Sequence, residues 1–377
     1  MHPEGWEGVR RVLAVRLDNI GDVVMLGPAL RTLRRALPDA SITLMASPAG
    51  SQVAPLLPWI DGVITHRAVW QDASSSMPLD PEREQGLVAS LREQRFDAAV
   101  IFTSFSQSPY PPAYACYLAG IPIRLGQARD FGGSLLSHWV RPLPDDAHQV
   151  DRNLHLLEAA GFASAGRNLE LWVPAEVQAA ADGVLRAAGI DPAAPFVVIA
   201  PGASCAARRY ALDRFAAVAR MLGAADGLPM VVVGSARETG IAAPILEACA
   251  GRVVSLVGQT SVPELAAVIR RAALVLANNS GPMHFADVFG RPVAVLYSGT
   301  EYESQWRPRG APAAVLRRET DCSPCYRFEC PYHMECLDIP PEEVAAAALE
   351  LVRAGRSAPK TGLHPRPLPQ FWGRGRG

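Results

Sequence analysis

The sequence lacks any apolar run long enough to cross a membrane, and residues 1–10 show no apolar core before a cleavage site. We therefore expect no membrane span and no signal peptide, and we expect a cytoplasmic protein. The formal net charge of -1 argues against a nucleic-acid binder. With 377 residues, the chain is longer than a single core usually organises, so two domains are expected.

Two phosphate-binding motifs are also absent. No G-x-G-x-x-G follows the first predicted strand, and G-x-x-x-x-G-K-[ST] occurs nowhere in the chain. These absences argue against a dinucleotide oxidoreductase and against a P-loop NTPase.

Short apolar strands alternate with helical patterns, and the rhythm restarts after a polar break at residues 142–149. The predicted strands cover residues 11–17, 41–46, 97–102, 196–200, 230–233, 253–257, 274–276 and 292–296. The predicted helices cover residues 22–37, 87–94, 152–161, 212–222, 242–249 and 262–271. This alternation predicts an α/β fold with two doubly wound domains, each a parallel sheet with helices on both faces.

We expect the first domain over residues 1–170, the second over 171–356 and a flexible tail over 357–377, which is rich in Pro, Gly and Arg. Ligands of such sheets bind beyond the carboxyl ends of the strands. The cleft between the two domains is therefore the expected site.

The most informative loop is Asn278–His284, which joins an apolar strand to a short helical pattern. Ser280 is predicted to cap that helix, Gly281 allows a ligand to approach closely, and Pro282 suits the first helical turn. His284 adds a donor in the same turn. Such a helix start favours phosphate, although a capped loop without a ligand would show the same residues.

Three further loops follow predicted strands. Asp22 suits either a helix start or a general base that faces an acceptor hydroxyl. The turn Pro201–Ser204, followed by Arg208 and Arg209, suits either a diphosphate or a solvated basic turn. Glu238 suits either ribose hydroxyls or a helix N-terminus. Together the four loops predict a nucleotide-diphosphate sugar as ligand.

These loops, in this order, resemble glycosyltransferase family 9, the ADP-heptose:lipopolysaccharide heptosyltransferases. The resemblance extends from about Arg11 to about Val352, and its most specific pieces are Arg16–Asp22 with Pro28–Arg31, Pro201–Ser204 and Asn279–His284. It implies a GT-B fold, with two Rossmann-like domains around a cleft. It also implies transfer of heptose with inversion and without a catalytic metal.

The resemblance assigns roles to individual residues. Asp22 matches the catalytic aspartate, which removes the proton from the acceptor hydroxyl. The residues that it places around the donor are Asp18, Asn19, Gly21, Gly202, Ser204, Arg208, Glu238, Thr260, Asn279, Ser280, Gly281, Pro282 and His284. The implied partners are ADP-heptose and a glycan or lipid-linked acceptor at the inner face of the membrane.

Three positions depart from the family pattern. Asn279 stands where aspartate is usual, Arg208 where lysine is usual, and Tyr210-Ala211 where Trp-Pro is usual. Asn279, together with a cluster of four cysteines in the second half, leaves open another nucleotide sugar or a protein or small-molecule acceptor. A non-catalytic scaffold that uses the cysteine cluster for assembly is a further alternative. In the first half, four residues are expected on the acceptor side: Ser104, Gln107, Tyr110 and Tyr114. Arg124 and Arg129 are expected to meet an anionic acceptor.

Four of the seven cysteines form the pattern Cys322-x2-Cys325-x4-Cys330-x5-Cys336. In a reduced compartment this spacing favours a structural zinc, iron or iron–sulfur site, while two local disulfides or free thiols are the alternative. The autotransporter heptosyltransferases of the family carry a four-cysteine iron site in this half, with a different spacing. Cys205, in the predicted phosphate turn, is expected to be reactive. Metal identity, acceptor identity and oligomeric state stay open at this point.

Overall fold

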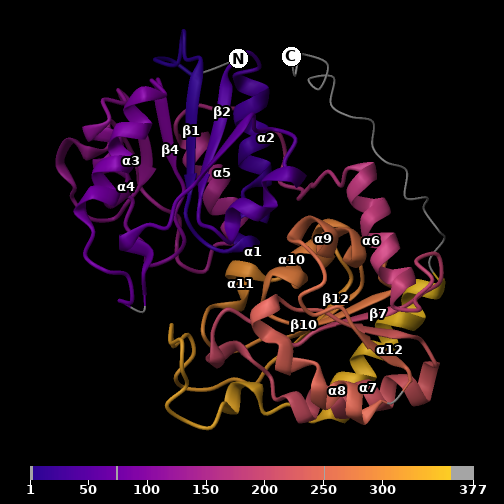
Figure 1. Cartoon of the computed structure of the whole chain (residues 1–377). Helices are drawn as coiled ribbons and strands as arrows, with labels where there is room; N and C mark the ends of the chain where they lie inside the picture. Colours follow the sequence, from indigo (N-terminus) through magenta and orange to yellow (C-terminus); the bar gives the residue numbers. More distant parts are fainter. Residues whose placement is uncertain (1–2, 74, 250, 358–377) are drawn as a thin grey trace. The chain divides into compact units, whose positions relative to one another are not determined.

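The computed structural model of the chain describes residues 3–73, 75–249 and 251–357, and they form two compact units that divide between Trp172 and Val173 (Figure 1). Of the predicted tail, only Ser357, the last residue of helix α12, lies within the described residues. No helix in the described part of the chain is long and apolar enough to cross a membrane.

The first unit is built on a six-stranded parallel sheet in the order β3-β2-β1-β4-β5-β6. Its strands are β1 (Arg11–Arg16), β2 (Ser41–Ala46), β3 (Gly62–Thr65), β4 (Ala98–Ile101), β5 (Ile123–Gln127) and β6 (His138–Val140). Its α-helices are α1 (Ile20–Val24), α2 (Gly27–Ala36), α3 (Pro81–Glu93), α4 (Tyr110–Leu118) and α5 (Gln149–Ala159).

The second unit holds another six-stranded parallel sheet, in the order β12-β11-β10-β7-β8-β9. Its strands are β7 (Val197–Ala200), β8 (Met230–Val232), β9 (Val253–Ser255), β10 (Leu274–Asn278), β11 (Val293–Leu296) and β12 (Ala313–Leu316). Its α-helices are α6 (Ala175–Ala187), α7 (Leu212–Asp226), α8 (Ala243–Ala248), α9 (Val262–Arg271), α10 (Gly281–Val288), α11 (Glu303–Trp306) and α12 (Pro341–Ser357).

Both sheets have the same topology. In each, the first and fourth strands of the unit are neighbours: β1 beside β4, and β7 beside β10. The strand order reverses at these two places, and a doubly wound sheet binds its ligand there, beyond the carboxyl ends of the strands. The predicted α/β fold with two Rossmann-like units is thus confirmed.

One predicted helix is wrong. The apolar spacing over residues 22–37 predicts one continuous helix, whereas the chain forms α1 and α2, separated at Met25 and Leu26. Pro28 explains the break, because it has no backbone N–H and its ring would clash inside a helix. It stands in the first turn of α2, where it is well tolerated. The break keeps α1 short, directly after β1.

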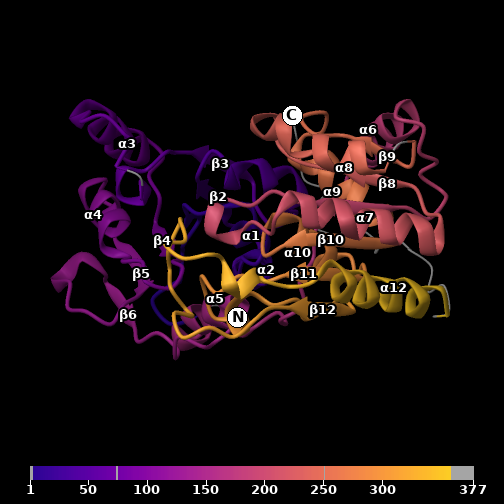
Figure 2. The same ribbon diagram turned by 90° about the horizontal axis from the view of Figure 1, so that it is seen from below.

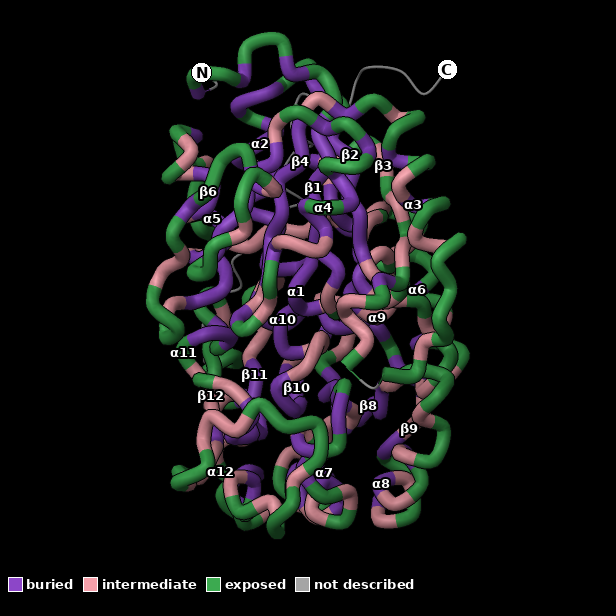
Figure 3. The backbone as a smooth tube through the Cα atoms, turned by 90° about the vertical axis from the view of Figure 1, so that its left-hand side faces the viewer, coloured by how far each residue is buried: buried purple, intermediate pink, exposed green. Residues whose placement is uncertain are grey.

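Each sheet is covered on both faces by helices. In the second unit, α7 contacts both α8 and α12, and these three helices share one apolar core with the sheet (Figure 2). Helix α9 contacts α6 and α10. The strand interiors are buried while many helix surfaces are exposed (Figure 3), which explains why most strands read as unbroken apolar runs.

Candidate functional site

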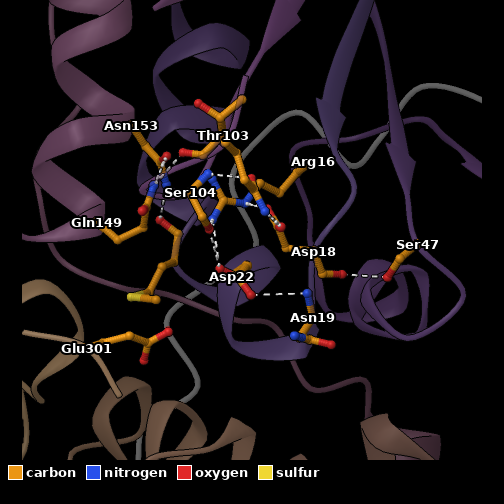
Figure 4. A network of polar contacts seen from close by, with 12 residues as sticks. Arg16, Asp18, Asn19, Asp22, Ser47, Thr103, Ser104, Gln149, Asn153 and Glu301 are labelled. Carbon is orange, nitrogen blue, oxygen red and sulfur yellow. Dashed lines mark hydrogen bonds and ion pairs between the residues drawn. The ribbon is translucent and has the colours of Figure 1, made fainter. Parts of the chain in front are cut away.

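In the first unit, Asp22 lies in α1, just beyond β1, with its carboxylate held on both oxygens (Figure 4). Oδ1 accepts hydrogen bonds from Arg16 Nη2 (2.7 Å) and from the Ser104 hydroxyl (3.1 Å), and Oδ2 accepts from the backbone N–H of Asn19 (3.0 Å). Ser104 follows β4, the neighbour of β1. The carboxylate is therefore fixed at the point where the strand order reverses.

Arg16 is completely buried and also pairs with Asp18, at 2.8 Å from Nε to Oδ2. The other oxygen of Asp18 accepts a hydrogen bond from the Gln107 side chain. Burial raises the pKa of Asp18 to about 6; the Arg16 charge opposes this shift and the Asp22 charge adds to it. One guanidinium thus holds two carboxylates, and the Asp18 side chain is directed to Arg16 and Gln107.

The basic residues expected on the acceptor side have other partners. Arg124 donates to backbone carbonyls, among them that of Leu135 at 2.7 Å, and Arg129 pairs with Asp145 on the surface. Sequence reasoning missed Arg152 of α5. It is 5% exposed and lies over the Phe105 ring at 4.9 Å. Burial, followed by repulsion from Arg16, lowers its pKa to about 10.

In the second unit, Asn278 joins the two central strands. Its side chain is wholly buried, accepts a hydrogen bond from the Tyr210 N–H (3.1 Å) and donates to the Pro201 carbonyl (2.8 Å). The end of β10 is thereby attached to the turn after β7. Asn279 is buried as well, and its amide oxygen lies 3.4 Å from the Ser298 N–H and 3.3 Å from the Ser298 hydroxyl.

Helix α10 starts at this second reversal point. Ser280 is its N-cap residue, but the predicted capping bond is absent, because the hydroxyl donates instead to the Asn278 carbonyl (3.4 Å). Pro282 lies in the first turn, as predicted. His284 is buried, with its ring at an edge-on angle 6.5 Å from that of Trp306. The helix start directs backbone N–H groups and a partial positive charge beyond the strands.

Arg208, in the short turn after β7, contacts Thr300, Ser204 and Glu301. Nε lies 3.2 Å from the Thr300 hydroxyl, Nη1 lies 3.3 Å from the Ser204 hydroxyl, and Nη2 forms an ion pair with Glu301. Neighbouring Arg209 donates to the Ala203 carbonyl. Of the two arginines in this turn, Arg208 is therefore the one bound to side chains from another loop.

Glu238 lies at the start of a short helical turn, which is one of the two alternatives predicted for it, and forms a capping box with Ser235. One carboxylate oxygen, Oε2, accepts from the N–H and the hydroxyl of Ser235, both at 2.8 Å. The other, Oε1, lies over Gly202, where an added Cβ would come within 2.3 Å of it. Gly202 thus leaves room for Glu238 beside the turn after β7. Thr260 precedes the N-cap of α9, and Gly21 is buried in α1.

The four-cysteine segment, residues 322–336, lies between β12 and α12. Burial raises the pKa of Cys336, and the other three thiols add to the shift. Among the described residues, no three His, Cys, Asp or Glu side chains converge as they would around a metal ion, and all seven cysteines are free thiols. The metal site predicted at the four cysteines therefore stays a prediction.

The surroundings of Cys205 bear on its predicted reactivity. Burial raises the pKa of this thiol, and the neighbouring Arg208 only partly opposes the shift. A thiol with a raised pKa remains protonated at neutral pH and is a poor nucleophile. The raised pKa therefore argues against the predicted reactivity of Cys205.

The sequence and the fold of the chain can now be compared with those of known proteins. The family model described as glycosyltransferase family 9 (heptosyltransferase) matches residues 85–335. The chain belongs to glycosyltransferase family 9. This family member is accordingly a glycosyltransferase, as its sequence predicts.

Individual relatives cover nearly the whole chain. Lipopolysaccharide heptosyltransferase 2 of Escherichia coli is 25% identical over 347 residues, which are 89% of this chain and 96% of that protein. A glycosyl transferase family 9 structure from Veillonella parvula has a TM-score of 0.75 at 23% identity, covering 92% of this chain and 98% of that one. The E. coli ADP-heptose lps heptosyltransferase II has a TM-score of 0.72 at 23% identity, covering 92% and 100%. These structures share the GT-B fold with this chain.

Proposed function

We propose that this enzyme transfers heptose from ADP-heptose to a hydroxyl of a lipopolysaccharide core or a related acceptor, with inversion and without a catalytic metal. The observation that carries the proposal is the fixed Asp22 carboxylate beyond β1, since a general base must be held in place to accept a proton. The relatives named as heptosyltransferases support the sugar and the acceptor class.

The reaction would proceed in one displacement. The acceptor hydroxyl attacks the anomeric carbon of the sugar while Asp22 takes its proton, and the bond from that carbon to the diphosphate breaks. Attack from the face opposite the leaving group inverts the anomeric configuration. The negative charge that gathers on ADP would be stabilised by the N-terminus of α10, the turn at Gly202–Ser204 and Arg208.

Nucleotide recognition would use the same turns. We propose Glu238 as the acceptor of ribose hydrogen bonds and Thr260 as a residue near the adenine. Ser280, Gly281, Pro282 and His284 would contact the diphosphate and sugar. We also propose Gly21, Asp18 and Asn19 as donor-binding residues, with Asp18 acting through Arg16.

An anionic acceptor is favoured by Arg152. Its guanidinium is buried against Phe105, and its Nε has no hydrogen-bond partner in the described part of the chain. A buried cation without such a partner is costly, so an acidic group of the acceptor would stabilise it. A phosphate or carboxylate on a lipid-linked glycan at the inner membrane face meets this requirement.

Asn279 supports an alternative hypothesis about the donor. The family usually has an aspartate at position 279. The neutral amide of Asn279 is instead bonded to Ser298. Without that charge, a nucleotide sugar other than ADP-heptose is the alternative donor. The same difference keeps a protein or small-molecule acceptor as the alternative substrate.

The decisive experiment measures donor binding and transfer separately, with Asp22→Asn as the variant. We expect ADP and ADP-heptose to raise the melting temperature of both proteins, and only the wild type to transfer heptose to a lipopolysaccharide core acceptor. Full transfer by Asp22→Asn would reject the base. If only a different nucleotide stabilised the protein, ADP-heptose would be rejected as the donor in favour of a sugar linked to that nucleotide. No stabilisation by any nucleotide would favour a non-catalytic scaffold.

We also propose that Cys322, Cys325, Cys330 and Cys336 hold a structural metal once the segment closes around it, since four thiolates suit zinc, iron or an iron–sulfur cluster. Metal analysis of anaerobically purified protein, with Cys325→Ser as control, would show metal bound to the wild type and less to the variant. Wild-type protein without metal would leave four free thiols.

A further inference from the structure

We propose that Glu301 competes with the diphosphate for Arg208 and thereby sets how readily the product ADP leaves. The proposal rests on the proposed function, because it takes the turn after β7 as the diphosphate site. Glu301 would act through Arg208, as a positioning residue whose charge also opposes the bound phosphate.

The ion pair is well shielded. The side chains of Arg208 and Glu301 are only 21% and 16% exposed. Solvent and salt weaken such a pair less than an exposed one, so the charge on Glu301 affects any anion that approaches Arg208. The same charge acts on buried neighbours, since Glu301 adds to the raised pKa of Tyr297 and of Cys205.

Both halves of the ion pair are attached to the four-cysteine segment. The Cys325 N–H donates to the Gly299 carbonyl (3.0 Å) and the Tyr326 N–H to the Thr300 carbonyl (2.9 Å), just before Glu301. On the other side, the Ala207 N–H, next to Arg208, donates to the Phe328 carbonyl (3.0 Å). These bonds hold the two loops together, so Glu301 would stay near Arg208 when a diphosphate arrives.

The charge of Glu301 should weaken the binding of the product ADP more than the binding of the donor. The Arg208 guanidinium contacts Thr300, Ser204 and Glu301, so a phosphate oxygen that binds Arg208 has to share it with the Glu301 carboxylate. In a nucleotide sugar each phosphate carries one negative charge. After transfer, the terminal phosphate of ADP becomes a monoester with nearly one further negative charge at neutral pH. Repulsion from Glu301 would therefore weaken ADP more than the donor, and favour release.

The test is Glu301→Gln, which keeps an oxygen that accepts from Arg208 and removes the charge. We expect the dissociation constant of ADP, measured by calorimetry, to fall roughly tenfold, with stronger product inhibition and a smaller change in the KM of the donor. Glu303→Gln is the matched control: it makes the same charge change two residues along, in a residue paired with Arg307 at 3.6 Å. It should leave ADP binding unchanged.

A second variant separates charge from contact. Glu301→Asp keeps the charge on a shorter side chain, and we expect it to bind ADP no more tightly than the wild type does. Weaker ADP binding by Glu301→Gln would mean that Glu301 only holds Arg208 in place, and would overturn the competition. An equal gain in Glu303→Gln would assign the effect to net charge and overturn it too.

The proposed function can fail separately. If wild-type protein binds UDP or GDP in place of ADP, the donor nucleotide is wrong, and the four proteins are compared with the diphosphate that binds. If it binds no nucleoside diphosphate, both the donor site and the role of Glu301 are rejected.

Discussion

At the scale of single residues, the site is organised by buried side chains that bind other side chains. Asp22 is held by Arg16, by Ser104 and by a backbone N–H, so its position depends on partners that need not touch a substrate. The consequence is that substitutions one contact away from Asp22 should change turnover more than donor affinity.

Ser104→Ala tests this dependence. The hydroxyl donates to Asp22 Oδ1 at 3.1 Å and accepts from Arg16, so its loss leaves the carboxylate less well oriented. One hydrogen bond to a charged group contributes about 1.5 kcal/mol, which corresponds to roughly a tenfold lower kcat with little change in the donor KM. Steady-state kinetics measures both. Ser108→Ala, which removes a hydroxyl that accepts a hydrogen bond from the Tyr110 N–H, is the control. An unchanged kcat for Ser104→Ala would contradict the prediction.

Asp18 predicts a pH dependence of stability. Its pKa is raised from 3.8 to about 6 in the folded state, so the folded protein binds more protons than the unfolded chain between these values. Its contribution to the free energy of unfolding therefore falls as pH rises through this window. The free energy of unfolding of Asp18→Asn, relative to that of the wild type, should therefore rise by on the order of 3 kcal/mol between pH 4 and pH 8. Urea unfolding at several pH values measures the difference, and a difference independent of pH would refute it.

At the scale of elements, the turns after β7 and β8 depend on each other through one glycine. A Cβ at Gly202 would lie 2.3 Å from Glu238 Oε1, so Gly202→Ala would push Glu238 away from its position beside Ser235. We expect ADP affinity to drop by tenfold or more, as measured by calorimetry. Gly183→Ala in α6 has no atom within 4 Å of the new Cβ and should leave ADP binding intact while stabilising the fold by about 0.5–1 kcal/mol. Equal affinities in the two variants would contradict the prediction.

Helices and strands differ in how far the sequence predicted them. Helix α9 has its predicted bounds, and the structure shows what fixes them: Ser261 and Glu264 form a capping box at its start, and Arg270 and Arg271 lie in its last turn. Strand β6 was missed, since it has three residues, two of them exposed, and shows no apolar run. The prediction of a single helix at residues 22–37 was wrong because it relied on the apolar spacing and ignored the proline at position 28.

At the scale of the whole molecule, the fold and family were predictable, whereas the contacts within the site were only partly so. The strand-end loops at Asp22, Gly202 and Ser280 could be located because each follows an apolar strand. The partners Ser104 and Glu301 could not, because they come from loops distant in sequence that only the sheet order brings close. Asn278 had a signal, a polar residue ending a buried strand, that was read only as part of the loop.

Binding of ADP alone should slow backbone hydrogen exchange in the second unit but not in the first. We expect hydrogen exchange to slow in residues 201–208 and 279–284 of the second unit, because their backbone groups would contact the diphosphate. Residues 18–24 of the first unit should exchange at an unchanged rate. Exchange measured by mass spectrometry with and without ADP tests this expectation, and protection confined to residues 18–24 would reverse the assignment of donor and acceptor sides.

The shared strand order of the two sheets has a consequence for engineering. Each unit has its own sheet with its own reversal point, and within residues 3–357, as far as they are described, the chain passes from the first unit to the second between Trp172 and Val173. A hybrid enzyme joined there, with its first unit from one relative and its second from another, would inherit acceptor preference from the first parent and nucleotide-sugar preference from the second. Two substrate specificities could then be recombined as separate modules across a single junction.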